Sequence, residues 1–393
     1  MRIGLDLPPH IRVFGAFFLY AFSMGGIFPR LAEIQQAIGV AQGSFGLALI
    51  GAAVGTLISL TFATGLVERI GYRVILALIP LLSLLYAIAS FATGPIALFL
   101  LLLPAGLTIG VVEVVVNIEA DRVEHLVGFR IMNRSHAFWS IGFFTAGFVG
   151  AGFAQAGISP QIHLLIMVPI VVVGTLLILG KFDPAPHRAT AKAVETPRFA
   201  RPTTAILLLV MVTLSAMIME GAGIDWSAIY MRDVFHAAPF ILGFAVAAGA
   251  LMQALTRFFA DRFVERFSPV IVARALLTVL GLGVLLVFFA PTDWAALAGL
   301  GLMGMGTSVI FPLAMSAAAQ RTDRAAAINV AALAQISFVA FLFGPPLLGF
   351  VAEHFGVRWS FGIGLPLVVL SFVAANALGR KPIAAAVHPA PGE

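Results

Sequence analysis

Long apolar runs alternate with short polar gaps along the whole chain. A helix that crosses a membrane needs about 20 mostly apolar residues, and twelve such runs can be distinguished. Because backbone polar groups in lipid must bond within their own segment, runs of this length predict helices. We therefore expect an all-α membrane protein with 12 transmembrane helices. The runs lie near 11–28, 44–66, 74–92, 95–117, 134–154, 162–180, 204–224, 239–257, 270–290, 294–316, 327–350 and 359–379.

Composition supports this prediction. Of the 393 residues, 61% are hydrophobic and only 10% are charged, whereas soluble proteins carry about 25% charged residues. A water-soluble fold has too few polar residues here to cover its surface. The chain has no cysteine, so a disulfide framework and a cysteine-ligated metal are excluded. The first ten residues lack a signal-peptide pattern, so the first apolar run is expected to remain in the membrane.

Lysine and arginine distinguish the two ends of the spans. If the N-terminus is inside, 20 of the 23 basic residues fall in the inner gaps, and only Arg30, Arg232 and Arg358 fall outside. By the positive-inside rule, both termini are expected in the cytoplasm of a bacterium, with the protein in its inner membrane. The net charge of +5 does not indicate a nucleic-acid partner, because the basic residues do not gather on one polar face.

The longest internal polar segment, 181–203, follows the sixth run. Its prolines, alanines and charges predict an extended, flexible cytoplasmic linker. The predicted domains are an N-terminal six-helix bundle (1–180), this linker, a C-terminal six-helix bundle (204–380) and a cytoplasmic tail (381–393).

The two halves repeat each other weakly. A shift of 197 residues places Gly26-Ile27 on Gly223-Ile224 and Glu68-Arg69 on Glu265-Arg266. Matches at one offset near half the length indicate duplication, and two parallel six-helix repeats predict pseudo-symmetric bundles.

The loop after the second run, TGLVERIGYR (64–73), resembles the signature of major facilitator superfamily transporters: glycine, three residues, an acid, a base, one residue, glycine and further bases. Thr64 replaces the first glycine, with Gly65 beside it, and Tyr72 replaces a base. The copy in the second half has Ser268 in place of glycine. The resemblance implies the fold of that superfamily and a cytoplasmic latch that holds the halves outward-facing. The alternative is a positive-inside anchor with a helix cap. The latch residues are Gly65, Glu68, Arg69, Gly71, Arg73, Glu265 and Arg266.

Residues 113–142 and GPPLLG (344–349) resemble a bacterial branch of this superfamily that includes rhizobial rhizopine-transport-like membrane proteins. That branch has an acid four residues before an asparagine, an acid seven after it, and a histidine near Phe/Trp-Ser-x-Gly. The matching residues are Glu113, Asn117, Glu124, His136, Trp139, Ser140 and Gly142.

Two polar stripes lie on the fourth and fifth predicted helices. Helical spacing places Glu113, Asn117, Asp121 and Glu124 on one face, and Asn133, His136 and Ser140 on another. Charged groups within a membrane face the bundle interior, so the stripes are expected to meet or to line one vestibule. Glu113 and His136 are the proton-coupling candidates, since each can bind and release a proton. Alternatively, Glu113 pairs with Arg130 or Arg134, and His136 is structural.

Further polar and aromatic residues are substrate-binding candidates. Trp226, like Tyr230, could instead be an interfacial anchor. Arg257, four residues after Gln253, is expected to pair with Asp261. The full set is Tyr20, Ser23, Asn117, Ser140, Glu220, Asp225, Trp226, Gln253 and Gln335.

The sequence favours a secondary transporter over other functions. A proton-coupled symporter of a small polar solute, such as a sugar, polyol or inositol-like amine, is the first hypothesis, working as a monomer by alternating access. A proton-driven exporter of drugs or metabolites is the alternative. An enzyme is not expected, because the chain has no convergent nucleophile, metal-ligand cluster, phosphate loop or nucleotide fold, and no cofactor is implied. A non-transporting receptor is disfavoured, because no soluble domain accompanies the spans.

Overall fold

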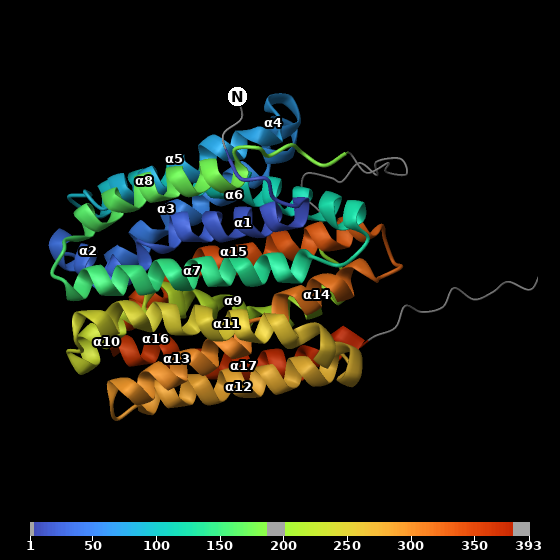
Figure 1. Ribbon diagram of the computed structural model, residues 1–393. Helices are drawn as coiled ribbons and strands as arrows, with labels where there is room; N and C mark the ends of the chain where they lie inside the picture. Colours follow the sequence, from blue (N-terminus) through green and yellow to red (C-terminus); the bar gives the residue numbers. More distant parts are fainter. Residues whose placement is uncertain (1–3, 187–200, 380–393) are drawn as a thin grey trace, which may run out of the picture.

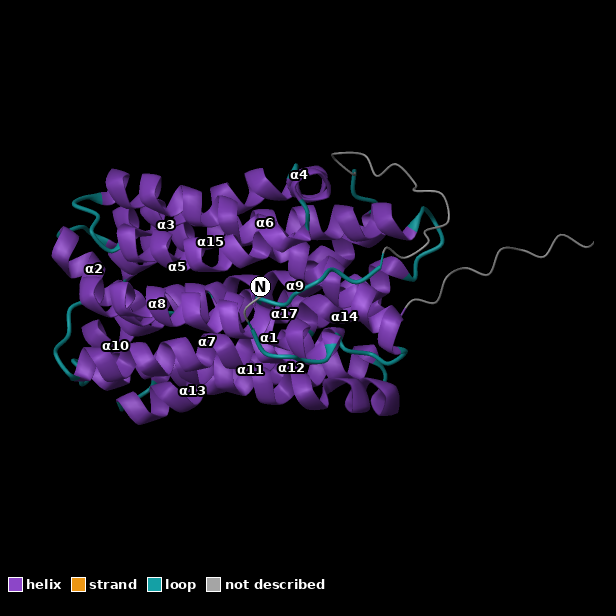
Figure 2. Ribbon diagram, turned by 45° about the horizontal axis from the view of Figure 1, so that its top comes forward, coloured by secondary structure: helices purple, strands orange, loops and turns teal. Residues whose placement is uncertain are grey.

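A computed structural model describes residues 4–186 and 201–379. Within these ranges the chain forms helices and no strand (Figures 1 and 2). Twelve helical segments are long and apolar enough to cross a membrane, so the predicted all-α membrane architecture with 12 spans is confirmed. The tail 381–393 and most of the predicted linker lie outside the described residues.

The first six spans are built from helices α1 to α8, with two short 3₁₀ turns. Their bounds are α1 (Pro9–Gly25), η1 (Phe28–Arg30), α2 (Leu31–Ile38), α3 (Gln42–Leu60), α4 (Ala63–Ile70), η2 (Tyr72–Val74), α5 (Ile75–Ala89), α6 (Pro95–Val127), α7 (Met132–Gln155) and α8 (Pro160–Leu179).

The last six spans are built from helices α9 to α17 and a final 3₁₀ turn. Their bounds are α9 (Thr204–Asp225), α10 (Ser227–Phe235), α11 (Pro239–Phe267), α12 (Pro269–Phe289), α13 (Asp293–Thr307), α14 (Ile310–Ala319), α15 (Ala326–Phe355), α16 (Val357–Gly362), α17 (Gly364–Ala374) and η3 (Ala375–Gly379).

The two halves pack against each other mainly through two helix pairs, α7 with α11 and α3 with α15. Figure 1 shows α7 and α11 running side by side along the boundary between the halves. Within the first half, α3 packs on α6 and α1 on α7. Small residues permit this close approach: a Cβ atom on Gly106 would lie 1.9 Å from the carbonyl oxygen of Ala52, and one on Gly142 would lie 2.3 Å from that of Phe18.

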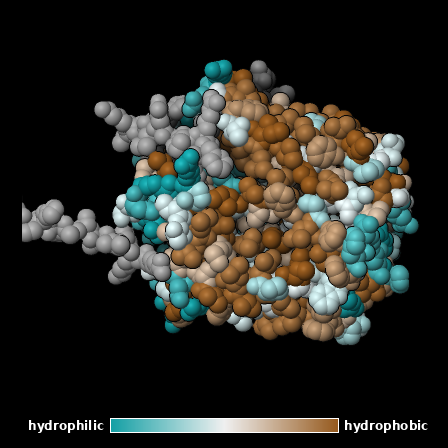
Figure 3. All heavy atoms as spheres, turned by 180° about the vertical axis from the view of Figure 1, so that it is seen from behind, coloured by the Kyte–Doolittle hydropathy of each residue, from teal (hydrophilic) through white to brown (hydrophobic). Residues whose placement is uncertain are grey.

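An apolar belt surrounds the bundle between two polar ends. Figure 3 shows hydrophobic side chains across the middle of one face and hydrophilic ones toward its two ends. Large apolar residues such as Leu100, Phe289 and Val373 are exposed in this belt, as expected for a surface in contact with lipid. We call the end near the start of α1 and the linker the inner end. The end that carries Arg30, Arg232 and Arg358 is the outer end.

Helix α6 extends beyond its apolar run to Val127, so the polar stripe from Glu113 to Glu124 is helical over its whole length, as its spacing predicts. Helix α15 is continuous through Pro345 and Pro346. One local expectation from the sequence needs correction. The first part of the linker is not free of the bundle: Phe182 and Ala185 are buried, and the backbone N–H of Ala185 donates to Glu119 Oε1 at 2.8 Å.

Candidate functional site

Glu113 lies on α6 and has two side-chain partners inside the first half. The amide of Asn117, one turn later, donates to Glu113 Oε1 and to its backbone carbonyl, each at 2.9 Å. The buried phenol of Tyr20 on α1 is also a hydrogen-bond partner of the carboxyl. The alternative pairing of Glu113 with Arg130 or Arg134 is therefore not observed.

A second polar group crosses from one half to the other at α7 and α11. Ser140 Oγ on α7 donates to Gln253 Oε1 on α11 at 3.3 Å. Arg257 Nη1, one turn further along α11, donates to Ser140 Oγ at 2.6 Å. Gln253 Nε2 in turn donates to Glu220 Oε1 on α9 at 2.8 Å. A carboxylate and a guanidinium are thus linked through a neutral amide and a neutral hydroxyl.

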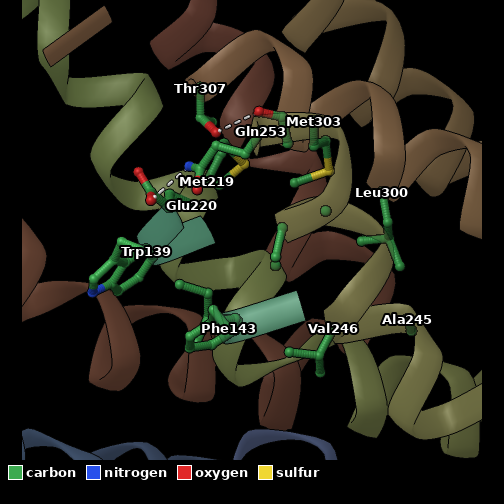
Figure 4. A pocket seen from close by; sticks show the side chains of 15 residues that line it. Trp139, Phe143, Met219, Glu220, Ala245, Val246, Gln253, Leu300, Met303 and Thr307 are labelled. Carbon is green, nitrogen blue, oxygen red and sulfur yellow. Dashed lines mark hydrogen bonds between the residues drawn. The ribbon is translucent and has the colours of Figure 1, made fainter. Parts of the chain in front are cut away.

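A cavity adjoins this polar group, at the boundary of the halves (Figure 4). We call it the central cavity. Helices α7, α9, α11 and α13 supply its lining, which includes Trp139, Phe143, Met219, Glu220, Gln253, Leu300, Met303 and Thr307.

Aromatic contacts connect the central cavity with the Glu113 group. The ring of Tyr20 meets that of Trp139 edge to face, with centroids 6.5 Å apart. Trp139 stacks on Phe143 at 5.4 Å, and both line the cavity. Glu113, the proton-coupling candidate, is therefore connected with the central cavity through Tyr20 and Trp139.

Glu113 and His136, one from each predicted polar stripe, contact different residues of α1. Helix α1 packs against both α6 and α7. Glu113 uses Tyr20 of α1, whereas His136 of α7 contacts Phe17 of α1, with ring centroids 5.1 Å apart. His136 also lies within electrostatic range of Arg257. Glu124 accepts from the backbone N–H of Ile131 at 2.7 Å, so it caps the start of α7.

Of the substrate-binding candidates, only Glu220 and Gln253 line the central cavity. Ser23 is buried and donates to the carbonyl of Tyr20 in its own helix at 2.7 Å. Gln335 is half-buried on α15. Ser140 bonds to the lining residue Gln253, whereas Asn117 bonds to Glu113 and is further from the cavity.

Asp225 and Trp226 mark the junction of α9 and α10. Trp226 is fully buried and packs near Gly349 of α15, so it is not placed as an interfacial anchor. Tyr230 is also fully buried, and its hydroxyl donates to the carbonyl of Val287 at 2.6 Å. Asp225 is half-buried and lies within electrostatic range of Tyr86 on α5.

The latch residues lie at the inner end. Gly65, Glu68 and Arg69 are on α4, which ends at Gly71 with a positive φ of 87°. Arg73 forms an exposed ion pair with Asp183 at 3.4 Å. Tyr72 receives a hydrogen bond from Arg122 at 2.9 Å and lies under its guanidinium. In the second half, Glu265 and Arg266 are exposed near the end of α11. A latch between the halves stays a prediction.

The two halves are joined at the outer end. Arg232 of α10 donates to the carbonyl of Ala32 at 2.6 Å and to Gln35 Oε1 at 2.7 Å, both on α2. The backbone N–H of Gly43 on α3 donates to Glu353 of α15 at 2.8 Å. These contacts hold the two halves together at the outer end.

Several residues of the site were missed from the sequence. The expected partner of Arg257, Asp261, has a side chain that lies outside the described ones; the structure describes bonds from Arg257 to Ser140 and, at 3.0 Å, to the carbonyl of Ser308. The position of Arg257 inside an apolar run was the sequence feature that could have identified it as a site residue. Met219 and Met303 line the cavity, and nothing in an apolar helix distinguishes them. Among the described residues, no group of histidines and carboxylates is arranged to hold a metal ion.

Comparison with known proteins identifies a family. The profile of the Major Facilitator Superfamily matches residues 208–393. An uncharacterized transporter, y4wD, of Sinorhizobium fredii is 30% identical over 370 residues, covering 91% of this chain and 94% of that protein. Membrane protein MosC of Rhizobium meliloti is 25% identical over 156 residues, 39% of this chain and 37% of MosC. The expected likeness to rhizobial membrane proteins is confirmed.

The fold is shared with a solved structure. The E. coli fucose:proton symporter FucP superposes with a TM-score of 0.62 at 19% sequence identity, covering 95% of this chain and 99% of FucP. The predicted arrangement of two six-helix bundles is thereby confirmed.

Proposed function

Because the chain belongs to the major facilitator superfamily, we propose that this transporter carries a small polar solute by proton-coupled symport. The solute class is a sugar, polyol or inositol-like amine. The membrane is the bacterial inner membrane, with both termini in the cytoplasm, as the distribution of lysine and arginine favours. The protein acts as a monomer through alternating access. The inner end is then cytoplasmic, and the structure corresponds to a state closed toward the outside.

One observation carries the coupling proposal: a carboxyl group within the membrane, Glu113, lies next to the central cavity through Tyr20 and Trp139. Ionisable residues at membrane depth are costly, and they mark ion and proton pathways. Glu113 has hydrogen-bond partners but no base within ion-pair distance among the described residues. A proton can therefore neutralise it without breaking an ion pair. The similarity in fold to a fucose:proton symporter supports the same mechanism.

Uptake into proteoliposomes under an imposed inward proton gradient tests this proposal. Solute accumulation is expected to rise with the gradient in the natural protein and to lose that dependence in Glu113→Gln. Asp121→Asn, which changes an exposed acid two turns further along α6, is the matched control and should retain it. Accumulation that is indifferent to the gradient, or unchanged in Glu113→Gln, would contradict proton coupling through this residue.

A second candidate function is a proton-driven exporter of drugs or metabolites. The lining of the central cavity favours it, because most of the residues are apolar or aromatic, including Phe143, Leu300 and Met303. The same proteoliposomes separate the two candidates. An exporter exchanges solute for protons, so it accumulates solute when protons leave an acidified vesicle interior. A symporter accumulates solute only when the exterior is acidic and protons enter with the solute.

A further inference from the structure

Glu220 is the only charged side chain among the residues that line the central cavity. One of its oxygens, Oε1, accepts a hydrogen bond from the neutral amide of Gln253. Its other oxygen, Oε2, makes no hydrogen bond with any described residue. A carboxylate in an apolar environment is costly unless a cation or several donors compensate its charge, and a single amide donor supplies only part of that compensation.

Arg257, the base whose charge attracts Glu220, is bonded to other residues. Arg257 lies within electrostatic range of Glu220, but its Nη1 donates to Ser140 Oγ and its Nε to the carbonyl of Ser308. No described base forms an ion pair with Glu220. Because Ser140 comes from the opposite half, the contact between the halves keeps the guanidinium on the far side of Gln253 and leaves the carboxylate available from the cavity.

The remaining lining fits an apolar body beside a cation. Trp139 and Phe143, stacked on each other, line the same cavity as Glu220 (Figure 4). An ammonium group near an aromatic face is attracted by the ring quadrupole, most strongly by that of tryptophan. Met219 and Met303 add flexible apolar surface that adapts to different shapes.

A neutral polyol finds few partners in this cavity. Besides Glu220, the polar side chains of the lining are Gln253 and Thr307. The amide of Gln253 is already bonded at both ends, to Glu220 and Ser140. The hydroxyl of Thr307 donates to the carbonyl of Gly304 at 3.2 Å. Most hydroxyl groups of a sugar would lose their water here without gaining a hydrogen bond, which disfavours binding.

We infer that the central cavity binds a solute with a protonated amine and an apolar body, and that Glu220 determines this specificity. The ammonium group binds Glu220 Oε2 near Trp139, and the apolar body lies among the methionines and leucine. This inference rests on the transport function proposed above. Of the solute class named there it retains the protonated amine, and it replaces the sugar or polyol body with an apolar one.

Thermal stabilisation of the purified full chain tests the inference, because a ligand that binds only the folded state raises the melting temperature. The probes are benzylamine, phenethylamine and tryptamine, their isosteric alcohols, and myo-inositol. At least one amine is expected to stabilise the protein more than its alcohol does, and myo-inositol is expected to have no effect. In Glu220→Gln the affinity for that amine should fall by about tenfold or more, since a charge-assisted contact is lost.

Two further variants guard against effects on folding. Glu220→Gln retains a carbonyl oxygen for Gln253, so its ligand-free melting temperature should stay close to that of the natural protein. Glu220→Asp keeps the charge and should keep the preference for the amine over its alcohol. Asp293→Asn removes an acid at the start of α13, outside the cavity lining, and should leave that preference unchanged. Equal stabilisation by alcohols, stabilisation by myo-inositol, no stabilisation by any amine, or amine affinity unaffected in Glu220→Gln would each overturn the inference.

This test is independent of proton coupling, because binding is measured without a gradient. Glu113→Gln is expected to keep the preference for amines. Failure of amine binding alongside gradient-driven uptake refutes only the solute class. Amine binding alongside gradient-independent uptake refutes only the coupling proposal.

Discussion

Replacement of Arg232 with alanine is expected to open the outer end. The guanidinium of Arg232 joins α10 of the second half to α2 of the first through Ala32 and Gln35. Hydrogen bonds to charged groups contribute about 1.5–3 kcal/mol each. The side chain of Arg232 is 24% exposed and also binds Asp233, so we discount the pair of bonds to about 2 kcal/mol in total. Since 1.4 kcal/mol is a factor of ten, the ratio of outer-closed to outer-open molecules should fall about 30-fold.

The absence of cysteine in the natural sequence makes the measurement direct. Spin labels on Gln36→Cys and Ala238→Cys, two exposed positions on the two halves at the outer end, report the distance between the halves. Arg232→Ala should shift the distance distribution toward longer values.

Arg358 provides a matched control for this experiment. It is also an arginine of the outer end, and it also donates to backbone carbonyls, those of Phe288 and Ala290, at 2.7 and 2.9 Å. All of these residues belong to the second half. Arg358→Ala should therefore lower stability without changing the distance between the labels. An unchanged distribution in Arg232→Ala, or an equal shift in Arg358→Ala, would refute the reasoning.

Two further predictions concern stability. Gly142→Ala places a Cβ atom against the backbone of Phe18 and should destabilise the protein by about 1–3 kcal/mol. In the control Gly152→Ala, on the same helix, the added Cβ atom meets no atom within 4 Å, so stability should not fall. Melting temperatures in detergent compare the two variants, and equal values would contradict the packing argument. Asp323 lies in the loop between α14 and α15, where desolvation raises the pKa of its carboxyl but the hydrogen bond from Asn329 and the charge of Arg321 outweigh it and lower the pKa. A lowered pKa stabilises the fold above the unfolded value of about 3.9, and this contribution disappears as the pH falls through the folded pKa. Asp323→Asn should therefore lower the melting temperature at pH 7, and this difference should shrink as the pH falls below about 3.9. A difference that does not change with pH would exclude this linkage.

The twelve spans could be predicted from the sequence because lipid imposes a simple requirement on length and polarity. Part of the polar arrangement could also be predicted. Helical spacing placed Glu113 and Asn117 on one face, and they bond to each other. Spacing within one helix does not identify the neighbouring helix, so the contact of Glu113 with Tyr20 was not predicted.

The cavity itself was beyond prediction, for a physical reason. Met219 and Met303 lie in stretches where apolar residues are not confined to one face, so no periodicity separates a cavity-facing residue from a lipid-facing one. The expected pairing of Arg257 with Asp261 considered only local contacts. The position of Ser140 beside Arg257 depends on how the two halves dock, which no local pattern encodes.

The short docked segment at the start of the linker determines where foreign sequence can be inserted. The backbone of Ala185 is held by Glu119 of the first half, and the carbonyl of Arg201 accepts from Arg324 of the second half at 2.7 Å. The two anchors leave residues 186–200 as the connection between the bundles, a stretch that can span at most about 50 Å. A reporter domain or protease site placed within 186–200 leaves both anchors in place, whereas one placed between Lys181 and Ala185 displaces Phe182 from the bundle.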